Sequence, residues 1–197
     1  MPSIDYDLSY LRAGASVLEE YLLSNEVFWP IGATPPAGEP PYPQLTLGGL
    51  LLARARLLAK SDSSTMTNER QVELANLEES LDAARARWRV AWESKATKEF
   101  GARLNLWRNF LNEYRENPAN NAGRYSYEVG RRVQLHLLGL EGAITPEQLE
   151  MLKGLDLMLK GAFEPGEFIW DGELAGGFPR ETYWYLYGQL RKGRSAA

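Results

Sequence analysis

The chain has 197 residues, of which 44% are hydrophobic, and this length and composition suit one folded core. It contains no cysteine, which excludes disulfide bonds, thiolate metal sites and cysteine nucleophiles and is typical of a reducing compartment. The formal net charge is -4, and Arg54 and Arg56 interrupt the most apolar stretch before it reaches the roughly 20 residues of a membrane-spanning helix. Asp5 and Asp7 occupy the place of the positively charged region of a secretory signal. We therefore expect a single cytoplasmic domain over residues 1–197, without membrane association.

Two helices are predicted in the first 60 residues. The first begins near Asp5 or Asp7, either of which can cap it, and runs to about Asn25. The second runs from about Leu45 to Ala59 and has few polar positions, which indicates burial on much of its circumference. Apolar residues recur at helical spacing in the first of them: Leu8, Leu11, Ala15, Leu18 and Leu22.

The connection between these helices, at about residues 26–44, is irregular and rich in proline. Residues 28–46 hold six of the eleven prolines of the chain, and "PPYP" matches the minimal pattern of a polyproline segment that aromatic grooves bind. The same stretch also contains Phe28, Trp29 and Tyr42, which a free flexible linker would not need. We therefore expect the segment to pack against the helices.

Residues 68–117 contain no proline and a single glycine, and their apolar residues recur about every 3.6 positions, which predicts one long helix. At a rise of ~1.5 Å per residue it would be about 75 Å long, more than twice the diameter of a compact domain of this size. Either the helix breaks near residues 94–101, or a second copy of the chain covers it. We favour a homodimer, with Trp88, Trp92 and Trp107 at the interface, because these side chains are costly to expose.

The rest of the chain begins with a reversal after Asn117 and a return helix from Tyr125 to Leu140, which predicts an antiparallel helical hairpin over about residues 68–140 that could protrude. "TPEQ" at 145–148 has the pattern of a capping box and predicts the start of a further helix. A second irregular aromatic segment follows at about 163–179, and for "TYWYLYG" after it we favour a short helix over a strand. The expected fold is an all-α helical bundle built around the long hairpin.

No catalytic residue, metal site or cofactor site is predicted. The only histidine, His136, lies on an apolar helix face and lacks the glutamate three positions before it that a di-iron site requires, so we expect a core histidine rather than a general base. The sequence has neither a nucleophile elbow nor a glycine-rich phosphate loop. A magnesium site built from carboxylates of different helices is left as an alternative.

Positive charge is concentrated in the middle of the chain. Residues 85–132 contain eleven lysines and arginines against five acids, although the sequence pI is about 5.2. This block could form a nucleic-acid-binding face led by Arg124, Arg131 and Arg132, or its arginines could pair with acids of the same bundle. We favour the second explanation, because Trp88 and Trp92 lie on the apolar face of the predicted helix and are thereby withdrawn from base stacking.

Three functions follow in order of preference. The first is a non-catalytic interaction or scaffold protein that binds a second copy of itself or another protein. The second is a small-molecule-binding protein or enzyme with its pocket between the two irregular segments. The third is the arginine-led nucleic-acid binder. The candidate ligand or partner surface of the second function consists of aromatic residues from both ends of the chain: Phe28, Trp29, Tyr42, Phe168, Trp170, Tyr183 and Trp184.

Overall fold

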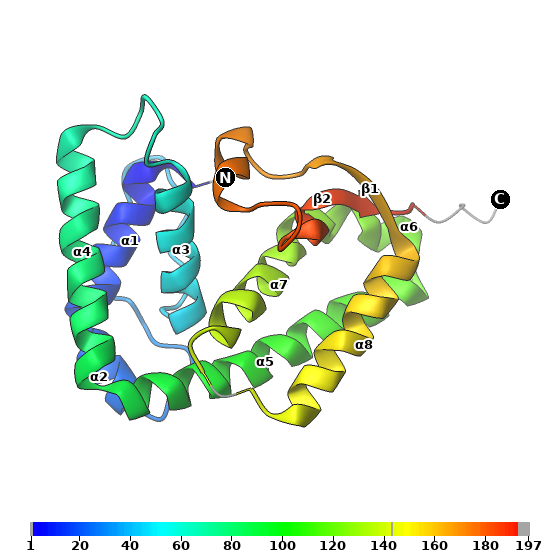
Figure 1. The fold of residues 1–197 in the computed structure, drawn as a ribbon, viewed down its shortest axis with the longest axis horizontal. Helices are drawn as coiled ribbons and strands as arrows, with labels where there is room; N and C mark the ends of the chain where they lie inside the picture. Colours follow the sequence, from blue (N-terminus) through cyan, green and yellow to red (C-terminus); the bar gives the residue numbers. More distant parts are fainter. Residues whose placement is uncertain (1, 143, 193–197) are drawn as a thin grey trace.

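A computed structural model describes residues 2–142 and 144–192, which form a mostly helical fold with one small sheet (Figure 1). None of the described helices combines the length and the apolar character that crossing a bilayer requires. The helices are α1 (Ile4–Ser16), α2 (Leu18–Leu23), α3 (Leu47–Ala59), α4 (Asn68–Arg87), α5 (Arg89–Glu116), α6 (Pro118–Asn121), α7 (Tyr125–Gly139) and α8 (Pro146–Ala162). Three short 3₁₀ helices, η1 (Ala122–Arg124), η2 (Gly172–Gly177) and η3 (Trp184–Leu186), accompany the strands β1 (Phe163–Phe168) and β2 (Tyr187–Leu190).

The helix starts follow their capping residues. Ser3, rather than Asp5 or Asp7, caps α1, because its side chain accepts a hydrogen bond from the backbone of Tyr6. Thr145 and Gln148 form the predicted capping box at the start of α8, with both reciprocal hydrogen bonds present. Thr46 caps α3 and also lines the candidate site.

The predicted long helix is broken at Trp88, earlier than residues 94–101. Trp88 lies outside the helical region of the backbone, with φ -113° and ψ 36°, and α4 and α5 run in clearly different directions on its two sides (Figure 1). The carboxylate of Glu141 lies at the bend. It forms an ion pair with Nε of Arg85 at 2.9 Å and accepts a hydrogen bond from Nε1 of Trp92 at 3.0 Å. The bend lets α4 pack on α1 while α5 packs on α7, which one straight helix could not do.

The tryptophans of this stripe are covered by the chain itself. Trp107 is fully buried and Trp92 is 3% exposed, while Trp88 is half-buried beneath the guanidinium of Arg87. Trp92 and Trp107 are therefore withdrawn from the oligomer interface that the sequence predicted for them. The bend shortens the helix and removes the reason for covering it with a second copy.

The segment "TYWYLYG", for which a short helix was favoured, contains the 3₁₀ helix η3 at Trp184–Leu186, and only its last two residues belong to β2. After η3, β2 pairs antiparallel with β1, with Phe163 opposite Leu190 and Glu164 opposite Gln189. Gly188 has a φ of +146°, and a Cβ there would lie 2.2 Å from the carbonyl oxygen of Glu164, so the pairing requires glycine at this position. Of the aromatic residues in "TYWYLYG", only Tyr187 lies in a strand, while the segment predicted as irregular begins with the strand β1.

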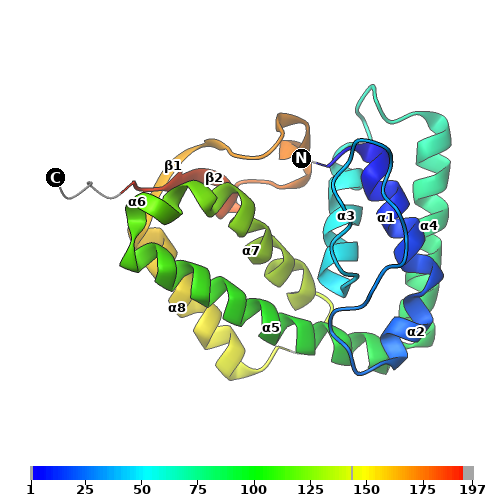
Figure 2. The ribbon, with the colours of Figure 1, turned by 180° about the vertical axis from the view of Figure 1, so that it is seen from behind.

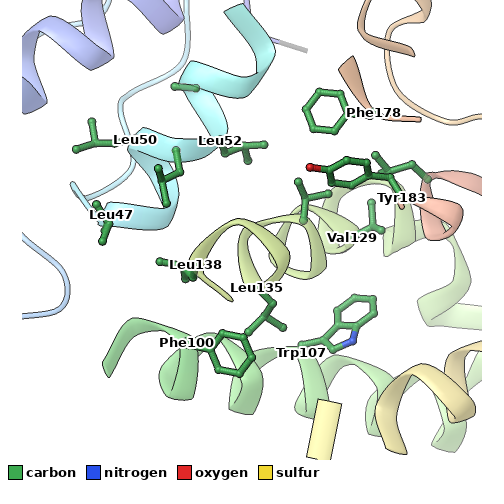
Figure 3. Packing of buried hydrophobic residues seen from close by; sticks show 14 of the residues in the cluster. Leu47, Leu50, Leu52, Phe100, Trp107, Val129, Leu135, Leu138, Phe178 and Tyr183 are labelled. Atoms are coloured by element: carbon green, nitrogen blue, oxygen red, sulfur yellow. The ribbon is translucent and has the colours of Figure 1, made fainter. Parts of the chain in front are cut away.

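Helix α7 lies at the centre of the core. After α6 and η1 reverse the chain, α7 packs on α5 on one side and on α3 on the other. Figure 3 shows Leu138 on the side of α7 toward Leu47 of α3, and Leu135 next to Phe100 and Trp107 of α5. Helices α3 and α5 also contact each other directly, and the candidate site is lined by residues of all three helices.

The proline-rich segment is attached to this core at both of its ends. Trp29 and Leu45 exchange two backbone hydrogen bonds of 3.0 and 2.8 Å. Tyr42 packs on the rings of Tyr6 and Tyr10, with centroid distances of 4.9 and 5.5 Å. Figure 2 shows the segment leaving α2 and running beside α1 and α3 before α3 begins.

Candidate functional site

A pocket of about 720 Å³ lies where α1, α3, α5 and α7 meet the two aromatic segments. Its described lining includes Arg56, Arg103 and Arg131 and no acidic side chain. We call it the arginine pocket. Its lining also includes Tyr6, Tyr10, Phe28, Thr46, Gly49, Leu52, Leu106, Tyr127, Gly130 and Trp170.

Helical spacing explains why these residues come together. On α3, the lining residues Gly49, Leu52 and Arg56 follow Thr46 at steps of three, three and four residues, so they share one face of the helix. On α7, Tyr127 and Arg131 are four residues apart and form a second such face. The pocket therefore runs along α3, from its capping residue toward its C-terminal end.

Arg103 is held by two partners at the start of α3. Its Nε donates to Oε1 of Glu99 at 2.5 Å, and its Nη2 donates to Oγ1 of Thr46 at 2.8 Å. The other carboxylate oxygen of Glu99 accepts the backbone N–H of Gly48 at 2.9 Å, in the first turn of α3, where the helix dipole favours a negative charge. These contacts fix the guanidinium of Arg103 before any ligand binds.

Arg56 is held in a similar way near the other end of α3. Its Nε donates to Oδ2 of Asp7 at 2.9 Å and its Nη2 donates to Oδ1 at 2.5 Å. Burial raises the pKa of the Asp7 carboxyl, whereas the hydrogen bond from Arg56 acts in the opposite direction. The two parallel hydrogen bonds set the plane of the Arg56 guanidinium.

Arg131 is the third arginine of the pocket and contacts Glu128, which also accepts Nη2 of Arg124 at 2.9 Å. Burial lowers the pKa of Arg131, and the positive charge of Arg103 acts in the same direction. Arg103 and Arg131 line the same pocket, so an anion bound there would be attracted by both.

The acids that pair with these arginines are shielded from the pocket. Glu99 is 0% exposed, Asp7 is 2% exposed and Glu128 is 3% exposed, and none of the three is among the described lining residues. A molecule that enters the pocket therefore meets guanidinium groups before it meets carboxylates. Such an arrangement favours negatively charged groups.

The tyrosines of the pocket act as neutral donors. The hydroxyl of Tyr10 donates to the carbonyl of Gln44 at 3.3 Å, and that of Tyr6 donates to the carbonyl of Pro41 at 3.4 Å. Burial raises the pKa of both tyrosines, so both stay protonated at neutral pH. The described lining contains no histidine, aspartate or glutamate.

The predicted aromatic surface is only partly gathered at this pocket. Phe28 and Trp170 line it, and Nε1 of Trp170 donates to the carbonyl of Ser126 at 3.2 Å. The backbone of Trp29 pairs with that of Leu45. Tyr42 packs on the rings of Tyr6 and Tyr10, which line the pocket. The remaining residues pack elsewhere, with Phe168 on Tyr187, Tyr183 on Phe178 and His136, and Trp184 on Phe163.

The basic block is largely paired inside the molecule. Arg132 donates to both carboxylate oxygens of Asp156 at 2.8 Å and is itself buried, so it cannot belong to an exposed basic face. Six further arginines of the block have acidic partners: Arg85 with Glu141, Arg87 with Glu19, Arg89 with Glu93, Arg103 with Glu99, Arg124 with Glu113 and Glu128, and Arg131 with Glu128. The predicted face of Arg124, Arg131 and Arg132 is thus not a free cationic surface.

Among the described residues, neither a metal site nor the second pocket of the molecule offers a comparable arrangement of charge. Within residues 2–142 and 144–192, histidine, aspartate and glutamate side chains are not grouped in a way that could hold a metal ion. A second pocket of about 460 Å³ lies at the bend between α4 and α5, but Arg85 and Arg89 in it face Asp82, Glu93 and Glu141. Its opposite charges neutralise each other within the same lining, unlike those of the arginine pocket.

The sequence did not identify Arg56, Arg103 or their acidic partners as site residues. Arg103 and Glu99 are four residues apart and lie next to the apolar stripe of α5 rather than on its exposed face. Charged residues at the edge of a buried stripe are a signal of a buried ion pair. The pairing of Arg56 with Asp7 has no such local signal, because 49 positions separate the two residues.

Comparisons with known proteins give no further guide to this site. No protein-family model matches the chain, and neither the curated proteins nor the solved structures contain a match to it.

Proposed function

We propose that this protein binds a small organic anion in the arginine pocket. The observation that carries the proposal is the set of three arginines at the lining, whose acidic partners are almost fully buried behind them. The volume of about 720 Å³ lies within the range of small-molecule sites. The aromatic and apolar residues Phe28, Leu106, Tyr127 and Trp170 favour a ligand that carries an apolar or aromatic body next to its charge.

This function stands in place of the interaction protein that the sequence favoured. The homodimer was expected because of Trp88, Trp92 and Trp107, and of these Trp92 and Trp107 pack in the core of one chain while Trp88 is half-buried. The homodimer stays a prediction that light scattering at micromolar concentration tests. Nucleic-acid binding loses support for a similar reason, since Arg132 is buried against Asp156.

The proposed function is tested with anilinonaphthalene sulfonate (ANS), an aromatic anion that fluoresces in apolar surroundings. Its uncharged counterpart, phenylnaphthylamine, has the same aromatic rings without the sulfonate. We expect one ANS per chain and affinity at least about tenfold above that of phenylnaphthylamine, because one charge-assisted hydrogen bond contributes about 1.5–3 kcal/mol. Equal affinity for the two dyes, or no binding of ANS, would contradict the proposal.

Two arginine variants locate the binding. Arg131→Gln should weaken ANS binding about tenfold, because it removes one guanidinium from the lining. Glu128 keeps its hydrogen bond from Arg124 in this variant, so the fold should persist. Arg115→Gln is the matched control, since Arg115 is exposed in the last turn of α5 and is not among the lining residues. A similar loss in both variants would place the dye outside the pocket.

A further inference from the structure

Two arginines of the pocket present the same unoccupied edge. In both Arg56 and Arg103, internal acceptors occupy Nε and Nη2, while no described residue bonds to Nη1. Arg56 binds one carboxylate through Nε and Nη2, so it keeps a free pair of N–H groups at its far end, on Nη1 and Nη2. Arg103 keeps both hydrogens of Nη1 and one of Nη2. Such N–H groups match the oxygens of a carboxylate.

The two arginines lie at opposite ends of the pocket. Arg103 is bonded to Thr46, the capping residue of α3, whereas Arg56 belongs to the last turn of that helix. Ten residues separate Thr46 from Arg56, which corresponds to about 15 Å along the axis at ~1.5 Å per residue. Helix α1 runs alongside in the opposite direction, since its Asp7 meets Arg56 and its Tyr10 meets Gly49.

The lining between the two ends is uncharged. Gly49 and Leu52 lie on the pocket face of α3 between Thr46 and Arg56, and Tyr6 and Tyr10 of α1 line the pocket beside them. Burial raises the pKa of both tyrosines, so they contribute no negative charge at neutral pH. The middle of the pocket thus suits a hydrocarbon or aromatic spacer.

We propose that the ligand is an elongated dianion with a carboxylate-like group at each end, one held by Arg103 and Arg131 and the other by Arg56. This inference rests on the proposed function and specifies its ligand class. The apolar middle of the ligand lies against the residues of α1 and α3 that line the pocket. The distance between the arginines selects the length of the ligand's spacer. The fixed guanidinium planes favour two planar anionic groups over one delocalised negative charge.

The test uses linear dicarboxylates in calorimetric titrations, without the dye. The probes are octanedioate, dodecanedioate and hexadecanedioate, each compared with its own monomethyl ester, which has the same chain and one negative charge fewer. We expect at least one dicarboxylate to bind about tenfold more tightly than its monomethyl ester, with an optimum of chain length. Equal affinity of every diacid and its ester, or no binding of any diacid, would overturn the inference.

The variant that tests the second anchor is Asp7→Asn with Arg56→Gln. Changing both partners avoids leaving Asp7 buried without its cation, which could otherwise unfold the protein. The double variant should bind diacid and ester with the same affinity, while its affinity for the ester stays within about twofold of the parent. A diacid advantage that survives in the double variant would overturn the role of Arg56.

Binding of ANS without a diacid advantage rejects the dianion and leaves the proposed function standing, whereas failure of ANS to bind rejects the proposed function itself.

Discussion

At the scale of single residues, the buried pair of Glu99 and Arg103 determines how the pocket is built. Arg103→Met should destabilise the protein by about 3–5 kcal/mol, because it leaves the carboxylate of Glu99 buried without its cation. The double variant Glu99→Gln, Arg103→Met should recover much of this loss, since it leaves no buried charge. Urea denaturation measures both. A double variant less stable than Arg103→Met would mean that the pair itself stabilises the fold.

His136 should make stability depend on pH in one direction. Burial lowers the pKa of His136, and the charge of Arg132 acts in the same direction, so the folded protein disfavours the protonated ring. Its contribution to stability is therefore complete above the unfolded pKa of 6.5 and is lost as the pH falls through the lower folded pKa. Urea denaturation between about pH 7.5 and pH 5 should show a larger loss for the parent than for His136→Gln. Parallel losses in the two proteins would contradict this assignment.

At the scale of elements, the start of α3 depends on glycine where Glu99 approaches the backbone. In Gly48→Ala, the new Cβ would lie 2.7 Å from Oε1 of Glu99 and 3.2 Å from Nε of Arg103. We expect a loss of about 1–3 kcal/mol and a displaced Arg103, as for overpacking of a core. Thermal unfolding followed by circular dichroism measures the change.

The matched control is Gly154→Ala in α8. Nothing lies within 4 Å of a Cβ built at Gly154, and the residue is exposed in the interior of a helix. This variant should be about 0.5–1 kcal/mol more stable than the parent, because alanine loses less backbone entropy in a helix. If both glycine variants changed stability equally, helix propensity rather than the contact with Glu99 would explain the result.

The elements themselves were largely predictable, and their interruptions were not. Periodic apolar residues and the capping box at Thr145 identify helices locally. No proline or glycine marks the break at Trp88 in the sequence. The side chains on its two sides, Arg85 and Trp92, both contact Glu141, which is distant along the chain. The strand β2 likewise depends on its partner β1, because the four residues Tyr187–Leu190 are too few to specify a strand until that partner is present.

At the scale of the whole molecule, the pocket is a product of tertiary structure. The sequence indicates that two aromatic segments could meet, and Phe28 and Trp170 do line one pocket. The sequence does not indicate that Arg56 from α3, Arg103 from α5 and Arg131 from α7 line it together. That arrangement follows from α7 packing between α3 and α5, which no local pattern encodes (Figure 3).

The most direct test of an anion site in this pocket is nitrogen-15 NMR of the arginine side chains during a titration with ANS. We predict that the Nε–H signals of Arg103 and Arg131 shift in a saturable way with one dye per chain, while the signal of the exposed Arg115 stays in place. Shifts confined to exposed arginines such as Arg115, or small shifts spread over all arginines without saturation, would contradict an anion-binding site in the arginine pocket.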